Sequence, residues 1–233
     1  DLSAQDCVDS GNNLNWFFPS PSYTWTGNGA DSNWSNPDNW NTPDIPDSDD
    51  AATFYGNAGP NAKKDCTINH SITVQGIEIL GSYTGTITQG TGNSITIGTS
   101  GYSQINGTFS GNDAGIDING PFTLTNGIFT STGGTLDVDG SFTFSSGTFN
   151  HNNGEVLARK EATWNVPSSG ITFYDFRINE TNLGDAGIIT IASGDTITVA
   201  NQFIHTNGLF NGGTVDILGN AVIDSTADGG NGT

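Results

Sequence analysis

Positive charge is scarce in this chain, which holds five Lys and Arg against 24 Asp and Glu and carries a formal net charge of -19. Nucleic-acid phosphates and anionic membrane surfaces both attract clustered Lys and Arg. The composition therefore argues against nucleic acid and anionic membranes as partners. Methionine is absent altogether, which is typical of a processed mature chain or of a fragment.

Long apolar runs are missing as well. No stretch approaches the roughly 20 apolar residues that a membrane-spanning helix needs, and no signal peptide is visible, so we expect no insertion into a membrane. Runs of Ala, Leu, Glu and Lys, which favour helices, are nearly absent. The chain is rich instead in Thr, Ser, Asn and Gly, with 33 glycines, and this predicts short strands joined by tight turns.

Cysteine is limited to Cys7 and Cys66. An even count in a chain of surface-like composition favours one disulfide between them. That bond closes a loop of roughly 60 residues, for which the chain-entropy model gives about 4 kcal/mol. The alternative is two separate buried thiols.

The sequence does contain a repeat, with a period of about 20 residues. Three consecutive copies span residues 102–121, 122–141 and 142–161, and each opens on an aromatic residue and places Phe two positions after Gly. A unit this short cannot bury an apolar face alone and must stack on its neighbours, as in a solenoid. Looser copies on either side bring the total to roughly eight rungs of about 20 residues each.

Alternation of polar and apolar residues predicts which side chains face the interior. Asp117 and Asp137 each lie between two apolar residues, so a strand directs these apolar pairs inward and each Asp outward. The two carboxylates are then about 4.8 Å apart on adjacent rungs. The phenylalanines of the Gly-x-Phe motif are expected to stack as a column inside the rod: Phe109, Phe129 and Phe149.

Other all-β architectures fit the pattern less well. Sandwiches and closed barrels also join short strands through Gly turns, but neither predicts Gly-x-Phe at a fixed interval. A left-handed solenoid of hexapeptides requires a six-residue apolar period, which the sequence lacks. The sequence therefore predicts an all-β fold, a parallel and right-handed β-solenoid.

The chain divides into three regions. Residues 1–60 show no period, and we interpret them as an N-terminal cap whose segment 13–18 (NLNWFF) reaches a neighbouring subunit. Residues 61–223 form the solenoid, and residues 224–233 form a polar, Gly-rich tail. Four tryptophans are expected to build the core of the cap, with a sugar-stacking platform as the alternative: Trp16, Trp25, Trp34 and Trp40.

The segment Thr24 to Phe54 contains, in order, the patterns W-x-G, W, N-W and P-x-x-x-D-x-A-x-F. It resembles the start of β-helical passenger and surface domains of secreted bacterial proteins, of the autotransporter and haemagglutinin-like adhesin type. The resemblance covers most of residues 24–223 and implies a secreted β-solenoid at the cell surface. The matching residues are Trp25, Gly27, Trp34, Asn39, Trp40, Pro46, Asp50, Ala52 and Phe54.

Few side chains suit catalysis. Polysaccharide lyases and hydrolases built on β-helices need an acidic cluster with a positioned Arg or Lys, and the candidates near the rungs are Arg159, Lys160 and Arg177. Arg177-Ile178-Asn179 differs by one residue from the R-I-K of polygalacturonases, and no G-H-G accompanies it. We therefore expect that the chain is not an enzyme.

Two further sets of candidate sites come from short patterns. Carboxylates of the cap region are candidate calcium ligands, although solvated acidic turns are the alternative because no D-x-D-x-D-G motif occurs: Asp31, Asp38, Asp47, Asp49 and Asp50. N-x-[S/T] motifs mark candidate glycosylation sites: Asn33, Asn69, Asn106, Asn179 and Asn231.

The sequence predicts an extracellular structural protein, a subunit of a surface filament or of an adhesin stalk. The exposed strand edges at the ends of a solenoid allow self-association by strand addition, or contact with a neighbouring solenoid domain. Surface glycans are further candidate partners. The alternative is a carbohydrate-binding or polysaccharide-cleaving β-helix, which a groove lined by exposed aromatics beside Arg159 and Arg177 favours.

Overall fold

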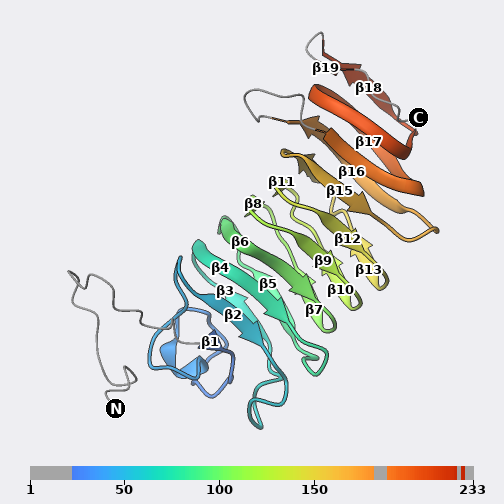
Figure 1. Cartoon of the computed structure of the whole chain (residues 1–233). Coiled ribbons are helices and arrows are strands. Elements are labelled where there is room, and N and C mark those ends of the chain that lie inside the picture. The colour runs from blue at the N-terminus through green and yellow to red at the C-terminus, as the bar shows by residue number, and fades with distance from the viewer. Residues whose placement is uncertain (1–22, 181–187, 225–226, 229–233) are drawn as a thin grey trace, which may run out of the picture.

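The computed structural model describes residues 23–180, 188–224 and 227–228. They form an all-β rod in which parallel strands lie over one another in about 8 turns, about 21 residues apart (Figure 1). The solenoid predicted from the repeat is thereby confirmed. Cys7, Trp16, Asn231 and segment 13–18 lie outside the described residues.

The larger sheet has 14 strands. In spatial order it contains β1 (Tyr23–Thr24), β2 (Ala51–Phe54), β4 (Ile72–Ile79), β6 (Ile95–Gln104), β8 (Ile116–Ile118), β11 (Thr135–Val138), β14 (Glu155–Ala158), β16 (Ile171–Asn179), β17 (Ile188–Ile217), β15 (Ala162–Asn165), β12 (Phe142–Phe144) and β9 (Phe122–Leu124). β18 (Asn220–Ile223) and β19 (Ala227–Asp228) pair with β17.

A second sheet of five strands closes another side of the rod. Its spatial order is β13 (Thr148–Asn150), β10 (Ile128–Thr130), β7 (Thr108–Ser110), β5 (Thr86–Gln89) and β3 (Cys66–Ile68). The strands of both sheets pair in parallel, and β6 pairs with β8 through its first residues and with β9 through its last. The large sheet therefore turns a corner of the rod and supplies two of its sides.

Glycines with positive φ separate the short strands of a rung. Gly107, Gly127 and Gly147 have φ angles of 69°, 92° and 94°, a region that side chains other than glycine rarely adopt. They also stack closely, since a Cβ built on Gly127 lies 2.7 Å from the carbonyl oxygen of Gly107. Both constraints explain why glycine recurs at the same place in each copy.

Two columns of aromatic rings fill the interior. In the first, Phe129 pairs in register with Phe109 and Phe149, and its ring stacks on theirs with centroid distances of 5.0 Å and 5.6 Å. The second column joins the aromatics that open the three copies, Tyr102, Phe122 and Phe142, and continues to Trp164 on β15, at centroid distances of 5.4, 4.6 and 4.7 Å. The two columns meet edge to face.

The N-terminal end of the described rod is covered by a tryptophan cluster. Trp25, Trp34 and Trp40 are buried and pack around Phe54, with Trp34 and Trp40 at a centroid distance of 4.8 Å. The Trp34 amide donates to the Thr67 carbonyl oxygen, which ties the cluster to β3. These three rings belong to a core and are not an exposed platform for sugars.

Cys66 lies on β3, faces the interior of the rod and is a free thiol in the structure. Burial raises the pKa of this thiol well above its usual value, so the thiol form is favoured. Because Cys7 lies outside the described residues, the predicted disulfide stays a prediction. Of the two alternatives, the buried thiol is the one seen at Cys66.

Candidate functional site

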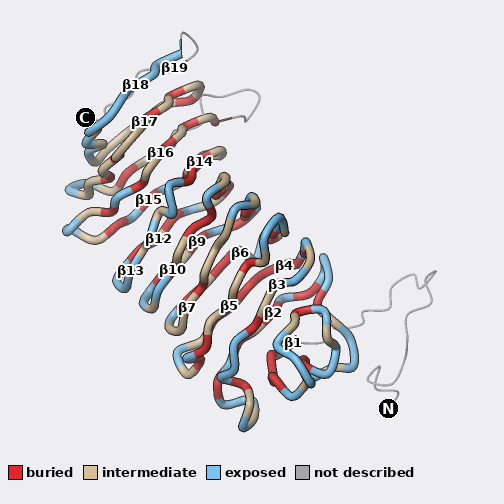
Figure 2. The backbone as a smooth tube through the Cα atoms, turned by 180° about the vertical axis from the view of Figure 1, so that it is seen from behind, coloured by how far each residue is buried: buried red, intermediate tan, exposed pale blue. Residues whose placement is uncertain are grey.

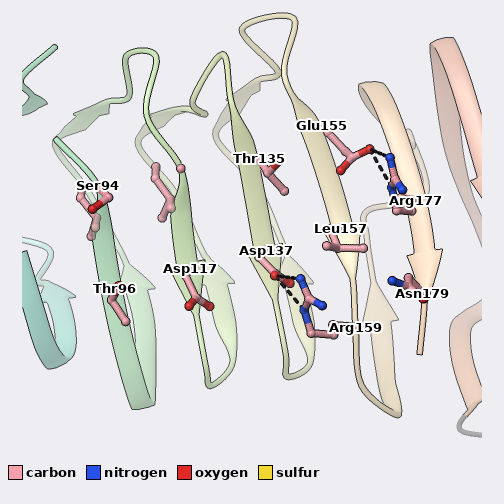
Figure 3. Close-up of a pocket in the computed structure, with 13 residues that line it drawn as sticks. Ser94, Thr96, Asp117, Thr135, Asp137, Glu155, Leu157, Arg159, Arg177 and Asn179 are labelled. Atoms are coloured by element: carbon pink, nitrogen blue, oxygen red, sulfur yellow. Dashed lines mark hydrogen bonds and ion pairs between the residues drawn. The ribbon is translucent and has the colours of Figure 1, made fainter. Parts of the chain in front are cut away.

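A groove of about 540 Å³ crosses the outer face of the large sheet. It runs over five neighbouring strands, β6, β8, β11, β14 and β16, and is lined by outward-facing side chains (Figure 3). None of the described residues that line it is aromatic. Exposed aromatic residues beside Arg159 and Arg177 would favour a carbohydrate-binding protein, and this groove has none among the described residues that line it.

Two ion pairs define the groove. Asp137 on β11 accepts hydrogen bonds through one oxygen, Oδ2, from Nε of Arg159 at 2.8 Å and from Nη2. Glu155 on β14 accepts a hydrogen bond from Nε of Arg177 at 2.9 Å and lies 2.8 Å from Nη2 in an ion pair. In both pairs the Arg comes 22 residues after the acid, slightly more than one rung, which makes the partners diagonal neighbours.

The basic side chains in and beside the groove are paired with carboxylates of the same chain. Arg159 also lies 3.9 Å from Asp139, and Lys160 contacts the other oxygen of Asp139. The hydrogen bond to Asp137 raises the pKa of Arg159. The three basic residues considered for catalysis thus hold adjacent rungs together, and pairs with partly exposed partners of this kind contribute up to about 1 kcal/mol each.

Asp117 is the acidic residue in the groove whose pKa is raised by its surroundings. Its Cα pairs with that of Asp137, so the two carboxylates project from adjacent rungs. Burial raises the pKa of Asp117, and the charges of Asp137 and Asp139 raise it further, while Arg159 and a hydrogen bond from Asn119 act in the opposite direction. The protonated form of Asp117 is therefore stabilised by folding.

Replacing Asp117 by asparagine is expected to stabilise the protein at neutral pH. A carboxyl whose pKa is raised by folding adds stability below its unfolded pKa and loses it as pH rises through the folded value. At pH 7 the ionised Asp117 is destabilising, and Asp117→Asn is expected to raise the free energy of unfolding by about 0.5–1 kcal/mol after screening by solvent. Urea titrations at about pH 7 and about pH 3.5 test this, because the gain must shrink in acid. Equal stability at neutral pH contradicts the expectation.

The acidic residues of the cap region are not arranged as the predicted calcium site. Within the described residues no group of three or more His, Cys, Asp or Glu side chains is placed to hold a metal ion. Asp31 instead accepts hydrogen bonds from the Asn33 backbone and from the amides of Asn33, Asn36 and Asn39. These donors lower the pKa of Asp31, so its carboxylate organises the turn.

The other acidic residues of that set either accept hydrogen bonds within turns or are exposed to solvent. Asp47 accepts from the Asp49 amide, and Asp50 accepts from the Asp47 amide. Burial raises the pKa of Asp50, which disfavours the charge that calcium requires. Asp38 lies in the 3-10 helix η2 (Pro37–Asn39), and its side chain is exposed.

Three of the candidate glycosylation sites have amides engaged in the fold. Asn33 donates to Asp31, Asn69 donates to the Ser35 hydroxyl, and Asn106 donates to the Gly81 carbonyl oxygen. Asn179 lies in β16 and lines the groove. Attachment of a glycan at Asn33, Asn69 or Asn106 requires these contacts to break.

The C-terminal end of the described rod is open. β18 follows β17 in register, so that Ile223 takes the position of His205 and, one rung earlier, of Ile178. His205 and Ile178 are buried, whereas Ile223 is 60% exposed. Leu218 and Val222 on the same turn are also exposed, and Figure 2 shows β18 as an exposed end.

No protein-family model, curated protein or solved structure matches this chain. The fold places it in the class of parallel β-solenoid proteins. Likeness to autotransporter passengers or haemagglutinin-like adhesins therefore stays a prediction from the sequence. Among the described residues, no helix has the length and apolar character to cross a membrane.

Proposed function

We propose that the chain is an extracellular structural protein, a rigid solenoid that joins a neighbouring solenoid end to end in a surface filament or an adhesin stalk. The observation that carries the proposal is the exposure of Ile223, at a position that the preceding rungs bury. In the part of the chain that the structure describes, β18 pairs with β17 alone. One edge of β18 is thus available for strand addition.

The two ends of the described rod differ in a way that supports this proposal. The tryptophan cluster covers the N-terminal end, while the C-terminal end presents Ile223 to solvent at a position that earlier rungs bury. A second copy, or the next solenoid of a stalk, buries this side chain when its own rung stacks on β18. Residues 13–18, for which the sequence predicts this contact, are the first segment to test.

The groove fits a structural role as well. Its two arginines are paired with carboxylates of neighbouring rungs, which strengthens the stacking of rungs across the sheet. The extracellular location rests on the sequence resemblance and on a composition rich in Thr, Asn and Gly.

Replacing Ile223 by asparagine is expected to weaken end-to-end association about tenfold, because an apolar side chain at a core position is lost. Sedimentation velocity over a range of protein concentrations measures the effect, and electron micrographs report filaments directly. Val222→Asn is the matched control, since Val222 is the adjacent, outward-facing residue of the same strand. A wild-type chain that stays monomeric at every concentration contradicts the proposal, and so does unchanged assembly of Ile223→Asn.

A further inference from the structure

The groove on the large sheet offers more than contacts between rungs. Oδ2 of Asp137 accepts both hydrogen bonds from Arg159, while Oδ1 is buried and has no hydrogen-bond donor among the described residues. A buried acceptor without a donor is costly. The Asp137 side chain as a whole is 15% exposed, so a ligand donor meets this under-satisfied carboxylate where it opens on the groove.

Further hydrogen-bonding groups lie on both sides of this oxygen. Figure 3 shows Asp117 on the strand before it and Thr135 on the same strand, both pointing into the groove. Arg177 donates a hydrogen bond to Glu155 through Nε and forms an ion pair with it through Nη2, and its side chain is 35% exposed, which leaves other N–H donors for a ligand oxygen. The groove thus presents two carboxylates on adjacent strands, with further donors on β16.

The charges of the groove restrict the ligand. Asp117, Asp137 and Glu155 are offset by Arg159 and Arg177 only, and the whole chain carries a net charge of -19. An acidic polymer is repelled by this field. Leu157 lies between the two ion pairs (Figure 3) but is buried, so the groove offers a ligand mainly hydrogen-bonding groups.

The shape of the groove favours a linear ligand. It crosses five strands whose spacing is about 4.8 Å, and equivalent positions on those strands face it in succession. The residues at these positions are Thr96, Asp117, Asp137, Leu157 and Arg177, so a sugar chain that lies along the rod axis meets a different group at each rung. Adjacent hydroxyls of one sugar are suited to two neighbouring carboxylates, because each hydroxyl is both donor and acceptor.

We propose that this groove binds a neutral polysaccharide laid along the rod axis, with adjacent hydroxyls of one sugar donating to the carboxylates of Asp117 and Asp137. This function is separate from end-to-end assembly, since the groove lies on the side of the rod and β18 lies at its end. A stalk or filament with such a groove binds glycans along its length.

Affinity electrophoresis in gels that contain dextran, xyloglucan or galactomannan tests the proposal, with polygalacturonate as the acidic comparison. We expect retardation in at least one of the three neutral gels and none in polygalacturonate. Asp117→Asn is expected to weaken binding about tenfold, the loss of one hydrogen bond to a charged group. Because this variant is expected to be more stable than the wild type, lost binding cannot be attributed to unfolding.

Two further variants sharpen the test. Thr96→Tyr places a bulky ring in the groove on β6 and is expected to abolish retardation. Glu78→Gln removes the same charge from β4 of the same sheet, outside the groove, and is expected to bind like the wild type. Binding to polygalacturonate as strong as to the neutral polymers overturns the proposal. It is equally overturned if no neutral polymer retards the protein, or if Asp117→Asn and Thr96→Tyr are both retarded like the wild type.

Discussion

Replacing Phe129 by alanine is expected to lower the free energy of unfolding by about 3–5 kcal/mol. The Phe129 ring is 1% exposed and lies between those of Phe109 and Phe149. It also meets Tyr102 and Phe122 edge to face at centroid distances of 5.3 and 4.9 Å. Its removal leaves a cavity where both aromatic columns meet, and the rungs on either side cannot close it without moving their paired strands.

Urea denaturation followed by far-UV circular dichroism measures the loss. Ile128→Ala is the matched control, because Ile128 precedes Phe129 on the same strand but is 42% exposed. This control is expected to change the free energy of unfolding by less than about 1 kcal/mol. Similar losses for the two variants are incompatible with an internal column.

Replacing Trp34 by alanine is expected to cost about 3–5 kcal/mol as well. Trp34 is fully buried and contacts Trp40 and Phe54 at centroid distances of 4.8 and 6.1 Å. Its loss opens the cluster that covers the N-terminal rungs, and the apolar interior behind Phe54 becomes accessible to water. The effect is expected in both tryptophan fluorescence and circular dichroism during urea denaturation.

Two controls separate the packing of Trp34 from other effects. Trp34→Phe keeps an aromatic ring and removes an indole N–H that has no acceptor among the described residues, so its cost is expected to be well below that of alanine. Asp38→Ala changes an exposed residue of the same region and is expected to leave the free energy of unfolding within about 0.5 kcal/mol. A Trp34→Ala variant as stable as Asp38→Ala contradicts the claim that the tryptophan cluster stabilises the N-terminal rungs.

The regular rungs could be predicted because large side chains mark their period. Phe109, Phe129 and Phe149 recur at one position of each copy, and each has a single inward register in a strand. Later rungs were harder, since Ile171 pairs with Ile197 and Ile178 with His205, at offsets longer than those of the earlier rungs. The offset is already 26 residues at Ile171 and Ile197, and two register shifts raise it to 28 at Asn179 and Asn207, so a search at a fixed period cannot follow these rungs.

The groove was only partly visible in the sequence. Facing Asp117 and Asp137 followed from the alternation in the repeats, and both residues line the groove. The pairs Asp137–Arg159 and Glu155–Arg177 were missed, although opposite charges spaced by slightly more than one rung are their signature once the period is known. Arg reaches a diagonal neighbour because its side chain is long, and a comparison of positions one period apart overlooks such pairs.

The calcium hypothesis lacks support in the structure for a different physical reason. Asp31, Asp38 and Asp47 are close in sequence, but a metal site requires their oxygens to converge on one point. In the structure the nearest donors to Asp31 are amide groups of asparagines in its own turn. Short-range hydrogen bonds of this kind are typical of Asp and Asn in turns, and the composition alone does not distinguish them from metal ligation.

Disulfide cross-linking between rungs tests the central claim most directly, that successive coils lie over one another in register. Thr108 and Ile128 face each other on adjacent strands, and Thr148 lies one rung further. Cysteines at 108 and 128 are expected to cross-link under mild oxidation within one chain, because paired strands are about 4.8 Å apart. Cysteines at 108 and 148, about 9.6 Å apart, are expected to stay reduced. Mass spectrometry of the peptides that reports the opposite order contradicts the stacked solenoid.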